Sequence, residues 1–132
     1  MLLAVDTSTS QLGLALYDGA AVAAELTWTS RARHTVELAP ALSGLLKRVG
    51  LSMGDLSALA VAVGPGSFTS LRVGLAFVKG LALARHLPLI GIPTLDSVAA
   101  AQPVQGLPMI AVLQAGRGRL AVGRYHCPAG SW

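Results

Sequence analysis

Hydrophobic and small residues alternate along the first part of the chain. Leu12, Leu14 and Leu16 alternate with Gly13 and Ala15, between an apolar run near the start and another that follows an Asp-Gly pair at 18–19. A period of two is typical of a β-strand. Asp-Gly between apolar runs is typical of a tight hairpin, whose type I′ turn requires positive φ at both central residues. We therefore expect three consecutive antiparallel strands, at about residues 2–6, 11–17 and 20–28.

Apolar positions then change to helical spacing. Thr35 can cap a helix at its start and Gly50 can end it. Glu37 in the first turn and Lys47 with Arg48 in the last are favourable to the helix dipole. The pattern predicts a helix over about 35–49, with these residues on its apolar side: Leu38, Leu42, Leu45, Leu46 and Val49.

The middle of the chain reads as strands alternating with helices. A continuous apolar run at 59–63 predicts a strand buried on both faces. The helix expected at 68–85 is apolar nearly all round, which is typical of a helix covered by its own protein or by a partner. A strand at 89–92 and a short helix from Pro93 and Thr94 to about 101 follow. The order βββαβαβα predicts an α/β fold, a mixed sheet with helices on its faces.

The opening strand-turn-strand pattern recurs late in the chain. The spacing from Met1 to Tyr17 is repeated from Met109 to Tyr125. This repeat makes Asp6 correspond to Gln114 and Gly13 to Ala121. The repeat suggests a duplicated architecture, and a chance match over so short a span is the alternative. We expect one complete lobe at 1–103 and the truncated start of a second, similar lobe at 104–132.

Composition limits the class of protein. Of 132 residues 53% are hydrophobic and 12% charged, which suits one domain with a real core and argues against disorder. The longest uncharged run, 97–116, contains prolines and glutamines and does not suit a membrane span. The start lacks the basic region of a secretory signal, and the single Cys127 permits no internal disulfide. We expect a soluble, cytoplasmic chain.

The net charge of +4 comes from small groups of cations around Arg31, Lys47 and Arg119. No aromatic residues interleave with them as in a single-strand nucleic-acid platform. Solvated surface charge is the favoured interpretation, and weak contact with nucleic acid stays open.

Two loops are candidate phosphate or anion sites. Gly64-Pro65-Gly66-Ser67 joins a strand to a helix start, where free N–H groups suit an anion. The loop lacks the Gly-Lys-Ser/Thr of a Walker loop, and a tight turn with Ser67 as helix cap is at least as favoured.

The second candidate is Asp6-Thr7-Ser8, at the end of the first strand. Phosphotransferases of the actin and sugar-kinase architecture carry an Asp here, followed by a glycine that lets backbone approach phosphate. Ser8 stands at the glycine position and Gln114 at the second carboxylate position, whereas phosphoryl transfer with Mg²⁺ needs carboxylates. A hydroxyl-rich turn capped by Asp6 is the favoured interpretation.

Other chemistry has less support. A ribonuclease-H-type nuclease needs clustered acids for two metals, and the strand at 59–63 ends in a glycine instead. His126-Cys127 lacks further ligands at zinc spacing, and Ser67 has no identifiable triad partners. We assign no metal site and no catalytic residue.

Five segments of the chain form a distinctive set: LLAVDTSTS at 2–10, Arg33-His34-Thr35, VGPGSFTSLRVG at 63–74, KGLALA at 79–84 and LIGIPTL at 89–95. Together they resemble a known family, the TsaB (YeaZ) proteins. The similarity covers roughly residues 1–100. Beyond Met109 the family usually reads D-A-R-x-G-E-V-Y, whereas this chain has QAGRGRLA at 114–121.

The resemblance implies a ribonuclease-H-like, actin-like ATPase fold of two lobes. It also implies a non-catalytic subunit needed for threonylcarbamoyladenosine in tRNA, which binds the kinase-like catalytic subunit TsaD. A TsaE-like ATPase and a second copy of the chain are further implied partners, with tRNA contacted indirectly. No cofactor of its own is implied, and ATP with Mg²⁺ enters only at the level of the complex. The alternative is an ATP-dependent phosphotransferase or ATPase of the actin-like superfamily.

We place the expected partner surface on the helices at 35–49 and 68–85. Arg72 is the sharpest candidate, because a cation among leucines needs a carboxylate or carbonyl partner. Ordinary core packing is the alternative for the apolar members. The full set is His34, Leu38, Leu42, Leu71, Arg72, Leu75 and Val78.

Overall fold

A computed structural model describes residues 1–30, 34–104, 106–116 and 118–126. Arg31, Arg33, Arg117 and Cys127, which entered the sequence analysis, lie outside the described residues. The elements in chain order are β1 (Leu2–Asp6), β2 (Gln11–Tyr17), β3 (Val22–Thr29), α1 (His34–Arg48), a 3-10 turn (Met53–Asp55), β4 (Ala58–Gly64), α2 (Phe68–Arg85), β5 (Leu89–Pro93), α3 (Thr94–Ala100), β6 (Met109–Gln114) and β7 (Leu120–Tyr125).

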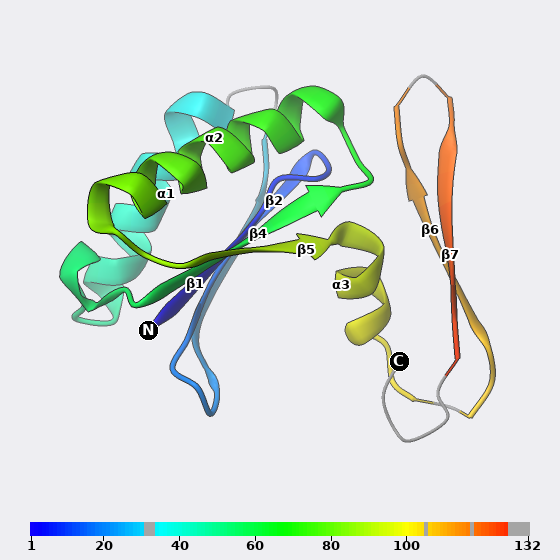
Figure 1. Cartoon of the computed structure of the whole chain (residues 1–132), viewed down its shortest axis with the longest axis horizontal. Coiled ribbons are helices and arrows are strands. Elements are labelled where there is room, and N and C mark those ends of the chain that lie inside the picture. The colour runs from blue at the N-terminus through cyan, green and yellow to red at the C-terminus, as the bar shows by residue number, and fades with distance from the viewer. Residues whose placement is uncertain (31–33, 105, 117, 127–132) are drawn as a thin grey trace.

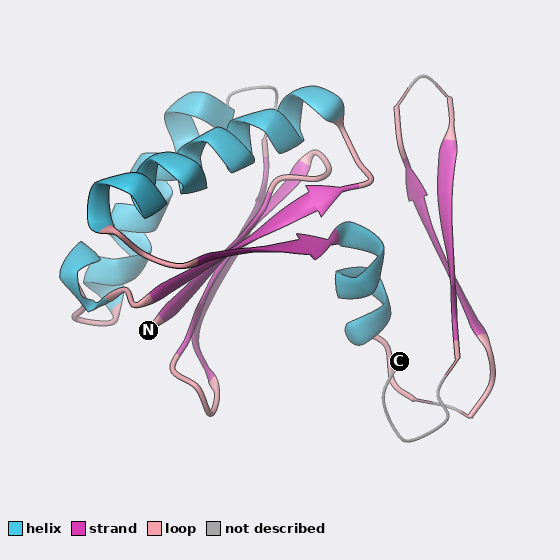
Figure 2. Ribbon diagram, in the orientation of Figure 1, coloured by secondary structure: helices cyan, strands magenta, loops and turns pink. Residues whose placement is uncertain are grey.

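The first five strands form one mixed sheet in the order β3-β2-β1-β4-β5. The pairs β1–β2 and β2–β3 are antiparallel, whereas β1–β4 and β4–β5 are parallel. Helices α1 and α2 lie together on one face of this sheet, and α3 lies between the sheet and the separate β6–β7 hairpin (Figures 1 and 2). The expected α/β fold and element order are therefore found.

The core lies between the sheet and the two long helices. Alternate residues of each strand face the helices, as Leu3 and Val5 of β1 show. Leu38 and Leu42 of α1 and Val78 of α2 are buried against them, at 2% exposure or less. The opposite face of the sheet carries small residues, which α3 and β6 cover in part: Ala4, Gly13, Ala15, Ala60 and Ala62.

The turn between β2 and β3 differs from the expected tight hairpin. It spans residues 18–21, and of Asp18 and Gly19 the glycine alone has positive φ (+107°). The Asp18 carboxylate accepts hydrogen bonds from the N–H groups of Ala20 and Ala21, at 2.7 and 2.8 Å. This side chain stabilises a longer loop, so the type I′ prediction is wrong and β3 begins at Val22 rather than residue 20.

The late hairpin matches the first in pattern but not in register. Asp6 pairs with Gly13 and Gln114 with Leu120, each as the last pair before its loop. Matched at these loop ends, Asp6 corresponds to Gln114 and Gly13 to Leu120; matched at Tyr17 and Tyr125 instead, Asp6 corresponds to Leu113 and Gly13 to Ala121. The equivalence of Asp6 and Gln114 stays a prediction. Counted between the last paired residues, the loop of the second hairpin is one residue shorter than that of the first. The equal spacing from Met to Tyr in the two hairpins does not reveal this difference. The division into lobes at residues 103 and 104 stays a prediction.

Among the helices formed by the described residues, none has the length and apolar content needed to cross a bilayer.

Candidate functional site

The two candidate phosphate loops meet at one edge of the sheet. Because β1 and β4 are parallel neighbours, the loops that follow them emerge side by side. The N–H of Ser67 donates to the carbonyl oxygen of Ser8 at 2.7 Å. A Cβ at Gly66 would lie 2.4 Å from the same oxygen, so only glycine allows this approach. The Ser67 N–H is therefore bound within the protein and is not free for an anion.

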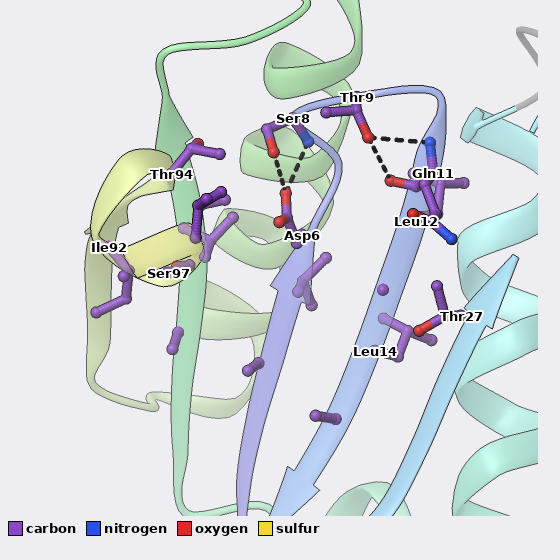
Figure 3. Close-up of a pocket in the computed structure, with 18 of the residues that line it drawn as sticks. Asp6, Ser8, Thr9, Gln11, Leu12, Leu14, Thr27, Ile92, Thr94 and Ser97 are labelled. Carbon is purple, nitrogen blue, oxygen red and sulfur yellow. Dashed lines mark hydrogen bonds between the residues drawn. The ribbon is translucent and has the colours of Figure 1, made fainter. Parts of the chain in front are cut away.

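Asp6 serves its own loop (Figure 3). Its Oδ1 accepts hydrogen bonds from the N–H of Ser8, at 2.8 Å, and from the Ser8 hydroxyl. This geometry confirms the hydroxyl-rich turn capped by Asp6. Within the described residues no group of three or more His, Cys, Asp or Glu side chains is placed to hold a metal ion.

Thr7 joins its loop to helix α2. Its side chain is fully buried, and its hydroxyl donates to the carbonyl oxygen of Ser70 at 2.8 Å. A Cβ at Gly74 would lie 2.2 Å from Thr7 Oγ1, so the glycine sets how closely α2 approaches β1. The structure thus brings Asp6, Thr7, Ser8, Gly66 and Ser67 together, but it uses their polar groups to hold the loops to each other.

Ser67 does not cap α2 through its side chain as expected. It occupies the N-cap position, but its hydroxyl makes no hydrogen bond to the backbone of the helix, and instead accepts one from Ser70 Oγ at 2.9 Å. The neighbouring Gly64 has φ of +102°, which a residue with a side chain rarely adopts. The loop is therefore a strand-to-helix turn held by backbone contacts.

Two cavities border these loops. One of about 480 Å³ lies over the small-residue face of the sheet beside α3, and Asp6, Thr94 and Ser97 line it (Figure 3). The other, of about 760 Å³, lies between the loops and the turn of the late hairpin, and His34 and Arg119 are among its lining residues. Sequence reasoning did not bring His34 and Arg119 together, because they are far apart in the chain and meet only through the fold.

The residues expected at a partner surface separate into two groups. His34, Leu38, Leu42 and Val78 are at most 9% exposed, and the three apolar ones belong to the core. The alternative of core packing therefore describes them, and as surface residues they were wrong. On α1 the one-sided apolar pattern already placed Leu38 and Leu42 on the side that faces the core. Helix α2 is apolar nearly all round, so its sequence does not reveal that Val78 faces the sheet.

The rest of the expected surface reaches solvent to different degrees. Leu71 and Leu75 are half-buried and Arg72 is exposed. The Arg72 guanidinium lies 5.1 Å from the centre of the Phe68 ring, so an aromatic ring takes the place of the expected carboxylate or carbonyl partner.

Large apolar side chains that sequence reasoning missed stand on the outer side of these helices. Val36, Phe68 and Leu83 are 65%, 73% and 78% exposed. Small or short residues are also exposed on the same helices, namely Ala39, Ser43 and Gly44 of α1 and Ala76 and Gly80 of α2. We call this set of exposed residues, with Arg72, the helix surface.

Comparisons with known proteins agree with this geometry. A family model described as "TsaD: tRNA N6-adenosine threonylcarbamoyltransferase" matches residues 21–129. The tRNA threonylcarbamoyladenosine biosynthesis protein TsaB of Escherichia coli is 40% identical over 98 residues, which cover 74% of this chain and 42% of that protein. TsaB of Bacillus subtilis is 35% identical over 126 residues, 95% of this chain and 55% of that protein. The chain belongs to the TsaB (YeaZ) family.

A solved structure extends the likeness to the fold. YeaZ from Pseudomonas aeruginosa superposes with a TM-score of 0.84 and 28% sequence identity, over 98% of this chain and 62% of that one. The likeness shows the actin-like, ribonuclease-H-like fold that the resemblance implied. The chain spans about half the length of the curated TsaB proteins that it matches.

Proposed function

We propose that this TsaB-family chain is a non-catalytic subunit in threonylcarbamoyladenosine modification of tRNA, and that it binds a TsaD-type catalytic subunit through the helix surface. The observation that carries the proposal is this surface itself. Val36, Phe68 and Leu83 are exposed on helices that also expose small residues such as Ala76 and Gly80, over which a partner helix could approach closely. Exposed apolar groups of this kind mark protein interfaces.

The site chemistry supports an accessory role. Asp6 is held by Ser8, and Gln114 corresponds to Asp6 when the two hairpins are matched at their loop ends. Metal-assisted phosphoryl transfer needs carboxylates free to hold Mg²⁺. The alternative of an ATP-dependent phosphotransferase or ATPase therefore has less support, and ATP with Mg²⁺ enters, in our proposal, only through the complex.

Further parts of the proposal rest on family membership alone. They are a TsaE-like ATPase as a third partner, self-association as a homodimer, indirect contact with tRNA, and a place in the cytoplasm.

Co-purification with the TsaD-type subunit of the same organism tests the proposal. Leu83→Asp replaces the most exposed large apolar side chain of the helix surface with a charge, and we expect it to weaken binding by at least about tenfold. Ile110→Asp is the matched control, because Ile110 is similarly exposed, at 61%, but pairs with Arg124 on the part of the β6–β7 hairpin farther from the starts of α1 and α2.

The control variant should bind as the unmodified chain does, and calorimetry would measure both affinities. Equal binding by Leu83→Asp and the unmodified chain would show that the helix surface is not the interface. Restoration of the modified nucleoside in a strain without TsaB would test the wider role.

A further inference from the structure

Cations that are far apart in the sequence meet at one end of the molecule. Helices α1 and α2 both begin at the cleft of about 760 Å³, which their first residues, His34 and Phe68, line. They extend over about 22 and 27 Å at the usual rise of an α-helix, and both end away from that cleft (Figure 1). Lys47 and Arg48 occupy the last turn of α1, and Arg85 occupies the last turn of α2.

The 3-10 turn at Met53–Asp55 connects these two helix ends. A terminal nitrogen of the Arg85 guanidinium lies 3.7 Å from the position that a Cβ at Gly54 would occupy. Lys47 and the start of the turn line one hollow of about 370 Å³. The fold therefore gathers Lys47, Arg48 and Arg85 around this turn, and we call these three residues the basic end.

The basic end is short of negative charge. All three side chains are exposed, and none of them forms an ion pair with a described residue. The one carboxylate of the turn, Asp55, accepts hydrogen bonds from the N–H and the hydroxyl of Ser52, at 2.8 and 2.7 Å. The negative ends of the helix dipoles favour cations here but leave the charged groups in contact with solvent. The surface therefore carries an excess of positive charge that a polyanion can neutralise.

The basic end also lacks the apolar side chains of a protein interface. None of the exposed large apolar side chains lies at residues 44–57 or 84–89. The nearest one, Leu83, stands two residues before Arg85, and residues two apart on a helix do not share a face. Protein interfaces place apolar and aromatic side chains at their centre, whereas Lys and Arg make most contacts with a nucleic-acid backbone. An RNA backbone therefore fits the basic end better than an acidic protein surface does.

The residues around the basic end also indicate which form of RNA it suits. Neither 44–57 nor 84–89 contains a Phe, Tyr or Trp. Proteins that hold single-stranded RNA stack its bases on such rings, whereas a double helix is contacted largely through its phosphates and 2′-hydroxyls. A double-helical stem is therefore the form of RNA that these side chains match.

We propose that the basic end binds the phosphate backbone of a double-helical stem of tRNA. The inference rests on the role in tRNA modification proposed above, but not on the helix surface. The TsaB relatives are named for tRNA threonylcarbamoyladenosine biosynthesis, which makes tRNA the polyanion that the proposed role supplies. Because phosphate contacts carry the binding, it depends on salt and not on base sequence. This direct contact differs from the indirect one that family membership alone suggests.

Binding of the full chain to fluorescently labelled tRNA of the same organism, followed by anisotropy, tests the proposal. We expect saturable binding with a Kd of about 100 μM or tighter at about 50 mM salt. Arg48→Gln combined with Arg85→Gln should weaken binding by at least about fivefold. The same variant should lower the slope of log K against log salt concentration by about 1.5, because two phosphate contacts are lost. An RNA duplex of unrelated sequence should compete with tRNA.

Arg119→Gln combined with Arg124→Gln is the matched control. Arg119 lines the cleft at which α1 and α2 begin, and Arg124 lies on the late hairpin. This variant loses the same two charges and should change the affinity less than twofold. On addition of tRNA, NMR shifts of backbone amides should change in the 3-10 turn and not in β6 or β7. Urea denaturation checks that both double variants fold.

A second variant separates loss of charge from damage to the turn. Lys47→Gln combined with Arg48→Gln leaves Arg85 against Gly54, and it should weaken tRNA binding as much as the first double variant does. Leu83→Asp should bind tRNA as the unmodified chain does. Loss of TsaD binding in that variant, with intact tRNA binding, therefore concerns the helix surface alone.

Four results would overturn the proposal. The first two are no saturable tRNA binding below about 1 mM, and equal weakening in the basic-end variant and its matched control. The third is binding to phosphatidylcholine vesicles that contain phosphatidylserine without any binding to tRNA. The fourth is loss of TsaD binding in the Arg48 and Arg85 variant while its tRNA binding stays unchanged, which would assign the basic end to an acidic protein surface.

Discussion

The two hairpins of the molecule have the same sequence pattern but different surroundings. In β1–β2 the inward residues Leu3, Leu14 and Leu16 are at most 1% exposed, because the pair lies inside a five-stranded sheet covered by α1 and α2. In β6–β7, a two-stranded sheet, the face towards α3 includes Ala111 at 4% exposure, whereas Ile110 and Val122 on the opposite face remain 61% and 57% exposed. Alternation therefore specifies a strand, whereas the stability of that strand comes from the layers packed against it.

The loops of the two hairpins differ in the contacts that hold them. The first is held to α2 by the Thr7 hydroxyl and to the next loop by Ser67. In the described part of the second, backbone hydrogen bonds close the turn from Ala115 to Arg119 and from Arg119 to Gly116. A loop fixed from outside positions its side chains more firmly than one closed only on itself.

Truncation of one apolar side chain in each hairpin should give the largest contrast. Leu14→Ala removes a side chain that is 1% exposed, and we expect it to lower the free energy of unfolding by about 3 kcal/mol. Val112→Ala changes a side chain that is 50% exposed, and it should cost less than about 1 kcal/mol. Urea denaturation measures both. Similar losses in the two variants would show that the late hairpin belongs to a covered core.

The next contrast concerns two glycines of α2. Gly74→Ala places a methyl group against Thr7, which cannot turn away without losing its hydrogen bond to Ser70. We expect a net destabilisation of about 2 kcal/mol, because overpacking exceeds the gain in helix propensity. Gly80 has no atom within 4 Å of such a Cβ, so Gly80→Ala should stabilise by about 1 kcal/mol.

Thermal and urea unfolding of both variants check this prediction. If Gly74→Ala were also stabilising, the first loop would not be held against α2 as closely as the geometry indicates.

Much of this fold follows from periodicity, since long apolar repeats have few other interpretations. Helix α2 begins and ends where the pattern predicts, at Phe68 and Arg85. The turn at Asp18 could not be predicted in the same way, because a side chain that accepts two backbone hydrogen bonds decides its length. The spacing of apolar residues along the chain does not indicate the length of this turn.

The candidate site also has features that the sequence predicts and features that it does not. The meeting of the Asp6 and Ser67 loops follows from the parallel pairing of β1 with β4. The sequence pattern predicts a mixed sheet but does not say which of its strands are neighbours. The cleft lined by His34 and Arg119 depends on how a distant hairpin docks, which no local pattern shows. The buried side of α2 was equally hidden, because apolar residues occur nearly all round it.

The smallest predicted effect concerns the one described side-chain hydrogen bond between the late hairpin and α3. Tyr125 donates its hydroxyl proton to Asp96 at 2.6 Å. This hydrogen bond, with minor contributions from burial and from the Asp96 charge, raises the pKa of Tyr125 to about 12, from an ordinary value of 10.0. Because the folded pKa lies above the unfolded one, the contribution to stability is fully present below pH 10 and is lost as the pH rises through 12.

Ultraviolet titration of the tyrosines tests this link. We expect one tyrosine to ionise near pH 12, and Asp96→Asn should bring it back towards its ordinary value, because the amide removes the negative charge and accepts the proton less strongly. Tyr125→Phe should speed hydrogen exchange of β6 and β7 amides while leaving β1 and β2 unchanged, since only the late hairpin loses an attachment. If Tyr125→Phe left the exchange rates of all four strands as they are in the unmodified chain, the late hairpin would be held by apolar contacts with α3 rather than by this hydrogen bond.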